Sequence, residues 1–93
     1  MSEFKIELVG LPNKLAGERE LAVDLDGTPT LAEVARALRR ARPELEGSLI
    51  KPGEDRLAGH YTFNVNGRFY MDQYDFVVRP GDRVIIVTLA MGG

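Results

Sequence analysis

The chain has 93 residues, of which 44% are hydrophobic and 28% charged, and its formal net charge is −2. These values are ordinary for a folded protein, and we predict one domain over residues 1–93. A charge this close to zero excludes a general electrostatic attraction to nucleic acid or to an anionic membrane. The absence of cysteine excludes disulfides, thiol catalysis and thiolate metal sites. No apolar run approaches the roughly 18 residues of a membrane span, so we expect a cytoplasmic protein.

The first 25 residues predict a β-hairpin. Two segments alternate apolar with polar residues, which is the pattern of half-buried strands. The stretch between them is rich in loop residues, so the two strands should pair. The apolar positions are Phe4, Ile6 and Leu8 in the first strand and Leu21, Val23 and Leu25 in the second.

The segment "TLAEVARALRRARPEL" predicts a helix. Thr30 and Glu33 form a capping-box pattern, in which each side chain accepts a hydrogen bond from the other residue's backbone N–H. Pro43 should end the helix, because proline has no N–H and disfavours helical angles at the residue before it. Apolar residues at helical spacing predict a stripe that packs on a sheet: Leu31, Val34, Ala35 and Leu38.

Arginines lie on the opposite face of this helix, at positions 36, 39 and 40, with Arg42 just beyond. Such a group is one candidate for a nucleic-acid surface. Glutamates are interleaved with the arginines, and no aromatic residue on that face is available to stack on a base. We therefore interpret it as a solvated helix face.

The second half of the chain predicts a long loop over residues 47–60, with a turn or short strand around Ser48–Lys51, and then a hairpin. In "YTFNVNGRFY" the Asn66-Gly67 pair is typical of a two-residue hairpin turn, and residues 80–82 predict another turn. Phe76 and Val78 should reach the core. The nearly continuous apolar run "RVIIVTL" predicts a central strand buried on both faces.

These elements predict an α+β fold with a mixed sheet of four to five strands and one main helix packed across one face. The last strand should lie between its neighbours and parallel to the first. Because one helix cannot cover both faces of the sheet, part of the other face should stay polar or bind a partner.

Few residues offer catalytic chemistry. His60 is the single histidine and lies in a glycine-flanked loop, without a recognisable nucleophile or orienting carboxylate. The scattered carboxylates lack metal-ligand spacing, and neither phosphate-binding glycine motif is present. We interpret the aromatic residues Phe69, Tyr70 and Tyr74 as packing residues, with a partner surface as the alternative. We expect no catalytic residue, no metal and no bound cofactor.

The final residues, "VIIVTLAMGG", run from the most apolar strand into Gly92 and Gly93. A frayed terminus is one interpretation. The other is a reactive tail: a carboxylate on two glycines can thread into a narrow channel, since no side chain blocks it. Adenylation by ATP would activate that carboxylate, and a sulfur nucleophile or a lysine amine would then accept the acyl group.

The succession of two strands, "TLAEVARALRRARPEL", "NVNGRFY", "RPGDRVIIV" and a final "GG" resembles the ubiquitin-like sulfur carrier family of the MoaD/ThiS type. That family includes the small subunit of molybdopterin synthase. The resemblance covers nearly the whole chain in order. It implies a ubiquitin-like β-grasp fold with a flexible tail over about residues 90–93.

The resemblance also implies a cycle in which the protein is a carrier and not an enzyme. An E1-like enzyme would use ATP to adenylate Gly93, and conversion to a thiocarboxylate would follow. Gly92 would let the tail thread, and Val87, Leu89 and Met91 would form the partner surface. A sulfur-accepting synthase subunit or thiolase would take the sulfur, in molybdopterin synthesis first, with thiamine synthesis and tRNA thiolation as other recipients.

Two other functions use the same features. A ubiquitin-like modifier would join Gly93 to lysines of other proteins after the same activation. A non-covalent β-grasp interaction module would bind partners through its surface and make no use of its tail.

Overall fold

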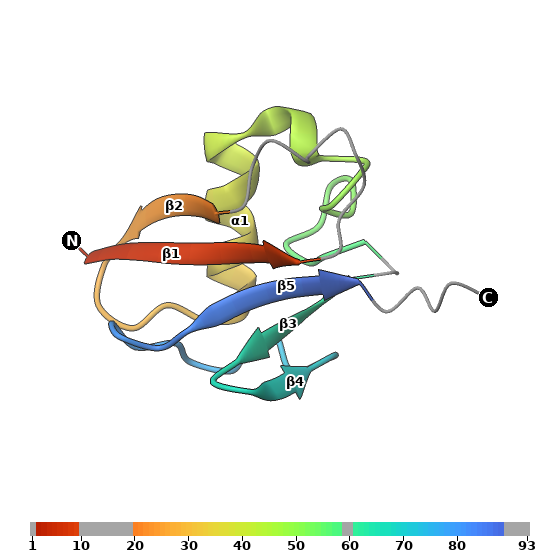
Figure 1. Cartoon of the computed structure of the whole chain (residues 1–93). Coiled ribbons are helices and arrows are strands. Elements are labelled where there is room, and N and C mark those ends of the chain that lie inside the picture. Colours follow the sequence, from red (N-terminus) through yellow and green to blue (C-terminus); the bar gives the residue numbers. More distant parts are fainter. Residues whose placement is uncertain (1, 10–19, 59–60, 89–93) are drawn as a thin grey trace.

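The computed structural model describes residues 2–9, 20–58 and 61–88. It shows a five-stranded sheet with one α-helix against one face (Figure 1). In chain order the elements are β1 (Ser2–Val9), β2 (Glu20–Leu25), α1 (Leu31–Ala41), the 3-10 helix η2 (Pro43–Leu45), β3 (Tyr61–Val65), β4 (Arg68–Tyr70) and β5 (Val84–Thr88).

The strands lie in the order β2-β1-β5-β3-β4. β1 and β5 are parallel, and the other neighbouring pairs are antiparallel. β5 is therefore the central strand and joins the two hairpins into one sheet. The predicted position of the last strand, between its neighbours and parallel to the first, is confirmed.

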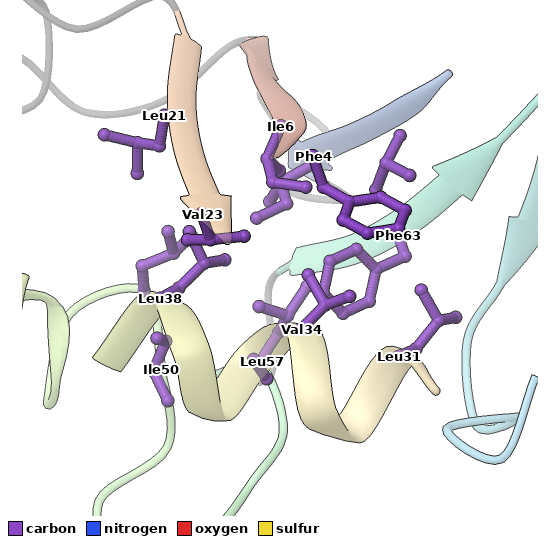
Figure 2. Packing of buried hydrophobic residues seen from close by; sticks show 14 of the residues in the cluster. Phe4, Ile6, Leu21, Val23, Leu31, Val34, Leu38, Ile50, Leu57 and Phe63 are labelled. Atoms are coloured by element: carbon purple, nitrogen blue, oxygen red, sulfur yellow. The ribbon is translucent and has the colours of Figure 1, made fainter. Parts of the chain in front are cut away.

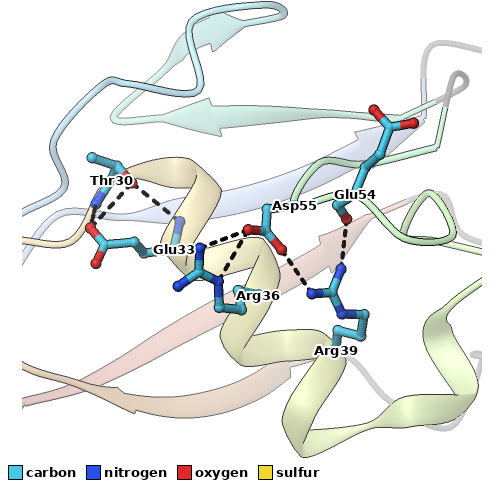
Figure 3. Close-up of polar contacts among 6 residues, drawn as sticks. All are labelled: Thr30, Glu33, Arg36, Arg39, Glu54 and Asp55. Carbon is cyan, nitrogen blue, oxygen red and sulfur yellow. Dashed lines mark hydrogen bonds and ion pairs between the residues drawn. The ribbon is translucent and has the colours of Figure 1, made fainter.

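Helix α1 begins and ends where its capping residues predict. The Oγ1 atom of Thr30 accepts a hydrogen bond from the Glu33 N–H at 3.2 Å, and a Glu33 carboxylate oxygen accepts one from the Thr30 N–H at 2.9 Å (Figure 3). The helix ends at Ala41, and Pro43 starts η2. Its buried residues are the predicted apolar stripe, Leu31, Val34, Ala35 and Leu38.

The core lies between α1 and the sheet face that α1 covers (Figure 2). Phe63 and Ile6 from the sheet and Val34 from the helix are completely buried. Burial of one side chain of this size stabilises the fold by about 1.5–3 kcal/mol. The alternation in β1 and β2 therefore predicted the inner face of the hairpin correctly for its buried members, Phe4, Ile6, Leu21 and Val23.

The prediction that the last strand is buried on both faces is wrong. In β5, Val84 and Ile86 are buried, whereas Ile85 and Val87 are only partly buried. The cause is the single helix: the described elements provide a second layer on one face only (Figure 1). Apolar residues on the opposite face of the central strand therefore remain accessible.

The connection from η2 to β3 does more than link two elements. It brings Leu49, Ile50 and Leu57 into the core, and Ile50 forms isolated β-bridges to Glu46 and to Leu57. The predicted turn around Ser48–Lys51 is confirmed, but the contribution of this loop to the core was not predicted. These leucines and this isoleucine follow no period of 2 or 3.6, so no pattern distinguishes them from surface residues.

Two helix arginines fasten this connection to α1 (Figure 3). Arg36 and Arg39 each contact one carboxylate oxygen of Asp55, at 2.9 and 2.8 Å. Arg39 also donates to the backbone oxygen of Glu54 at 2.8 Å. The hydrogen bond from Arg36 lowers the pKa of Asp55. Arg36 and Arg40 are exposed, in agreement with the predicted solvated face, but the ion pairs of Arg36 and Arg39 with Asp55 were not predicted.

Asn66 sets the turn between β3 and β4 and also ties that turn to β5. Its φ angle is +53° and that of Gly67 is +91°, the left-handed values that a two-residue hairpin turn requires. The Asn66 side chain accepts a hydrogen bond from the Arg83 N–H and donates one to Asp82. The predicted hairpin is confirmed, and its turn is held against the start of β5.

Most of the predicted aromatic packing is confirmed. Tyr70 stacks on Phe76 with ring centroids 4.1 Å apart, and Tyr74 meets Phe63 edge-on at 6.1 Å. Val78 is completely buried, as predicted.

The ion pairs of Asp55 give the first testable prediction. Because folding lowers the pKa of Asp55 below its ordinary value of 3.8, these pairs stabilise the fold above that pH and are lost as the pH falls through the folded pKa. We expect Asp55→Asn to lower the free energy of unfolding by about 1 kcal/mol at neutral pH. In urea denaturation the difference from the wild type should shrink as the pH falls below 3.8, because protonation of Asp55 removes the ion pairs.

Glu54→Gln is the matched control, because Glu54 lies beside Asp55 and its side chain makes, among the described residues, only the exposed pair with Lys51. This control should change the free energy of unfolding by less than about 0.5 kcal/mol. Equal losses in the two variants would contradict the fastening role of Asp55.

Candidate functional site

The helix-free face of the sheet carries an apolar patch. Side chains alternate between faces along a strand, so Ile85 and Val87 point away from the core that receives Val84 and Ile86. They lie at the centre of the sheet, and no described helix covers them (Figure 1).

The register of the strands extends this patch across the sheet. Val9 of β1 pairs with Val87, and on the next row Ile85 pairs with Asn64, which pairs with Phe69 of β4. Val9 is 52% exposed and Phe69 is 58% exposed. We call Val9, Ile85, Val87 and Phe69 the outer apolar patch. With strands about 4.8 Å apart, it spans about 14 Å from β1 to β4.

Carboxylates flank the patch on the same face, over β1 and β2. Glu3 lies opposite Asp24, and Glu7 lies opposite Glu20, with Lys5 between the two pairs. Like charges directly opposite each other destabilise a strand pair, so this arrangement disfavours the isolated hairpin. We call Glu3, Glu7, Glu20 and Asp24 the acidic margin.

One member of the acidic margin is neutralised from the centre of the sheet. Arg83, just before β5, contacts the Glu7 carboxylate at 2.6 Å. The hydrogen bond from Arg83 lowers the pKa of Glu7, so this carboxylate stays charged at neutral pH. The pair lies between the acidic margin and the outer apolar patch.

This face is suited to binding a protein surface. Contiguous exposed apolar side chains with a polar rim are typical of partner sites. Residues 2–9, 20–58 and 61–88 contain no group of three side chains able to hold a metal ion. No helix within those ranges is long and apolar enough to cross a membrane.

Of the residues predicted for the site, Val87 lies in the outer apolar patch. Its neighbours across the sheet, Val9 of β1 and Thr62 of β3, pair with it directly. The other predicted positions lie outside the described residues: Leu89, Met91, Gly92, Gly93 and the loop residue His60.

Phe69 was interpreted from the sequence as a packing residue, with a partner surface as the alternative, and it lies exposed in the outer apolar patch. Tyr70 beside it points to the core side and stacks on Phe76, whereas Phe69 points to the opposite face. The sequence does carry a signal for the face on which Phe69 lies. Once Asn66-Gly67 is taken as the two-residue turn, Phe69 must pair with Asn64, and paired residues share a face. Val9 and Ile85 carry no comparable signal, because their exposure depends on the absence of a second layer.

A mixed sheet in this order, with one helix across one face, defines a ubiquitin-like β-grasp protein. Solved structures agree. The crystal structure of SAMP1 from Haloferax volcanii matches with a TM-score of 0.78 at 25% identity, covering 99% of this chain and 100% of that one. A crystal structure of small archaeal modifier protein 1 from H. volcanii gives 0.74 at 23% identity, covering 95% and 98%. The solution structure of the Haloferax volcanii HVO 2177 protein gives 0.71 at 22% identity, covering 98% and 86%.

The chain belongs to the ThiS family, whose model matches residues 6–93. It is therefore of the ubiquitin-like sulfur carrier or modifier kind, and the family membership implies an E1-like activating partner. The resemblance and the β-grasp fold predicted from the sequence are confirmed. No curated protein matches the chain by sequence.

Two phenylalanines on neighbouring strands test the assignment of faces. Phe69→Ala should lower the free energy of unfolding by less than about 1 kcal/mol, because an exposed ring loses little burial. Phe63→Ala should lower it by about 3–5 kcal/mol, because it leaves a cavity in the core. Urea denaturation measures both, and similar losses would show that Phe69 is a structural residue.

Proposed function

We propose that this protein is a sulfur carrier that is itself the substrate of an activating enzyme, with Gly93 as the carrier residue. The observation that carries the proposal is the extent of the family match, which runs through residue 93 and so includes Gly92 and Gly93. In this proposal the chain performs no catalysis of its own and binds no cofactor.

The chemistry begins at the Gly93 carboxylate. One of its oxygens attacks the α-phosphate of ATP bound by the E1-like partner, which forms an acyl adenylate and releases pyrophosphate. Hydrosulfide then attacks the acyl carbon, displaces AMP and loses its proton, which leaves a thiocarboxylate. Gly92 contributes by having no side chain, so the tail fits a narrow channel up to the reacting carbonyl.

The geometry of the described residues supports docking beside the tail. β5 ends at Thr88, one residue after Val87 of the outer apolar patch. The five residues that follow span at most about 17 Å when fully extended. A partner seated on the patch therefore has its active site within reach of Gly93. Leu89 and Met91 would continue the contact along the tail.

The recipient that we propose is molybdopterin synthesis, through a sulfur-accepting synthase subunit. Thiamine synthesis and tRNA thiolation are the other recipients with the same donor chemistry, and a thiolase would act in the latter. All three need the same thiocarboxylate, so the outer apolar patch and the tail serve each of them equally.

A second function, protein modification, has a specific observation in its favour. Two crystal structures with this fold, compared above, are those of SAMP1 and of small archaeal modifier protein 1 from H. volcanii. A modifier would form the same acyl adenylate, and a lysine amine of a target would then displace AMP to give an isopeptide. The two functions differ only in the nucleophile.

The first test is an intact mass of the protein after incubation with ATP in extract of its own cells. We expect a C-terminal mass change from exchange of one oxygen for sulfur, or an adenylate adduct, because the terminal carboxylate is the group activated. Gly93→Pro and a chain with one residue added after Gly93 are the matched controls and should stay unmodified.

Two other outcomes point elsewhere. Isopeptide-linked species that need Gly93 and lack a thiocarboxylate would favour the modifier. An unmodified chain in an extract that activates a known carrier would overturn both covalent functions and favour the non-covalent interaction module.

The docking face has its own test in steady-state kinetics of the E1-like enzyme. Val87→Glu should raise the KM for this protein by at least about tenfold with little change in kcat, because a charge at the centre of an apolar interface is costly to bury. Lys51→Glu, in the exposed connection before β3, is the control and should leave both constants unchanged. Equal effects would show that the helix-free face is not the docking surface.

A further inference from the structure

β2 is an edge strand whose outer side opens onto a groove. It pairs only with β1 in the described part of the chain. Between β2 and α1 lies a groove of about 490 Å³, which Leu25 and Asp24 line from the strand and Ala37 and Arg40 line from the helix. We call it the β2–α1 groove. It lies at the edge of the sheet, apart from the outer apolar patch over β5 and β4.

We propose that the β2–α1 groove binds an extended segment of a partner protein, which adds to the sheet as a strand beside β2. An edge strand presents backbone N–H and C=O groups that a further strand can pair with, and alternate side chains of that strand then enter the adjoining groove. The inference rests on described residues alone and does not depend on activation at Gly93.

The residues that line the groove determine which side chains are favoured at the inward positions of the added strand. Leu25 and Ala37 are partly buried against the core and form an apolar floor. Arg40 is exposed and makes no ion pair among the described residues, whereas Arg36 one turn away is held by Asp55. The inward positions therefore favour apolar side chains followed by a carboxylate that pairs with Arg40.

The outward side chains of the added strand meet the acidic margin. On the helix-free face, β2 presents Glu20, Ala22 and Asp24. Opposite charges on neighbouring strands stabilise their pairing, so lysine or arginine is favoured at these positions. The segment that fits therefore alternates basic residues outward with apolar residues and one carboxylate inward.

The same charges argue against a second copy of this chain as the occupant. An antiparallel pair of β2 strands centred on Ala22 would set Glu20 of each copy opposite Asp24 of the other. Like charges directly opposite each other destabilise a pairing. The groove therefore favours a different protein.

The probe for this proposal is the synthetic peptide acetyl-KVKIKVKE-amide, titrated into the full chain labelled with nitrogen-15 for NMR. We expect saturable shifts over β2 and residues 36–41 of α1, with a Kd below about 1 mM. Two further peptides carry N-methyl groups on alternate backbone nitrogens. One is methylated at its odd-numbered residues and the other at its even-numbered residues. Because only one set faces β2 in an added strand, one of these peptides should lose at least about tenfold in affinity and the other should keep it.

Charge variants test the recognition of side chains. Arg40→Glu should weaken binding at least about fivefold, whereas Arg68→Glu, an equal charge change on exposed β4, should leave it unchanged. Circular dichroism verifies that both variants fold.

Four outcomes would overturn the proposal. They are no saturable shifts, shifts centred on β4, equal weakening by the two charge variants, and equal loss with both methylated peptides. Self-association of the free chain through β2 would identify a second copy as the occupant and overturn it as well. None of these outcomes affects the activation test at Gly93, which monitors a covalent change.

Discussion

The fold depends on the parallel pairing of β1 with β5. Without that pairing the described strands form two separate antiparallel units, β2 with β1 and β5 with β3 and β4. β5 belongs to the second unit and pairs with β1 of the first, and the ion pair between Glu7 and Arg83 joins residues 76 positions apart in the sequence. Contacts this distant in the sequence close late and slowly in folding, so the sheet is completed by the last described strand.

β5 contributes both to the core and to the face that we propose for docking. Its inner residues, Val84 and Ile86, hold the core together, while Ile85 and Val87 lie on the opposite face in the outer apolar patch. A partner that binds this patch touches the strand from which the tail departs. A change on the outer side of β5 can therefore alter docking with little loss of core packing.

The two sides of the molecule differ in charge as well as in burial. Carboxylates of β1 and β2 gather on the helix-free face, and arginines gather on α1. Asp55 neutralises part of the helix side and in doing so fastens the connection that carries Leu49, Ile50 and Leu57 into the core. The net charge of −2 conceals this separation, because opposite charges on opposite sides cancel in a sum.

Local chemistry in the sequence by itself determined the helix from its Thr30 cap, the Asn66-Gly67 turn and the alternating strands, because each depends on residues within a few positions of one another. The nearly continuous apolar run "RVIIVTL" also predicted the central place of β5. Only the tertiary structure decided that Ile85 stays accessible and that Asp55 holds the connection before β3 against α1. Those outcomes depend on which layers cover which face and on contacts between residues far apart in the chain.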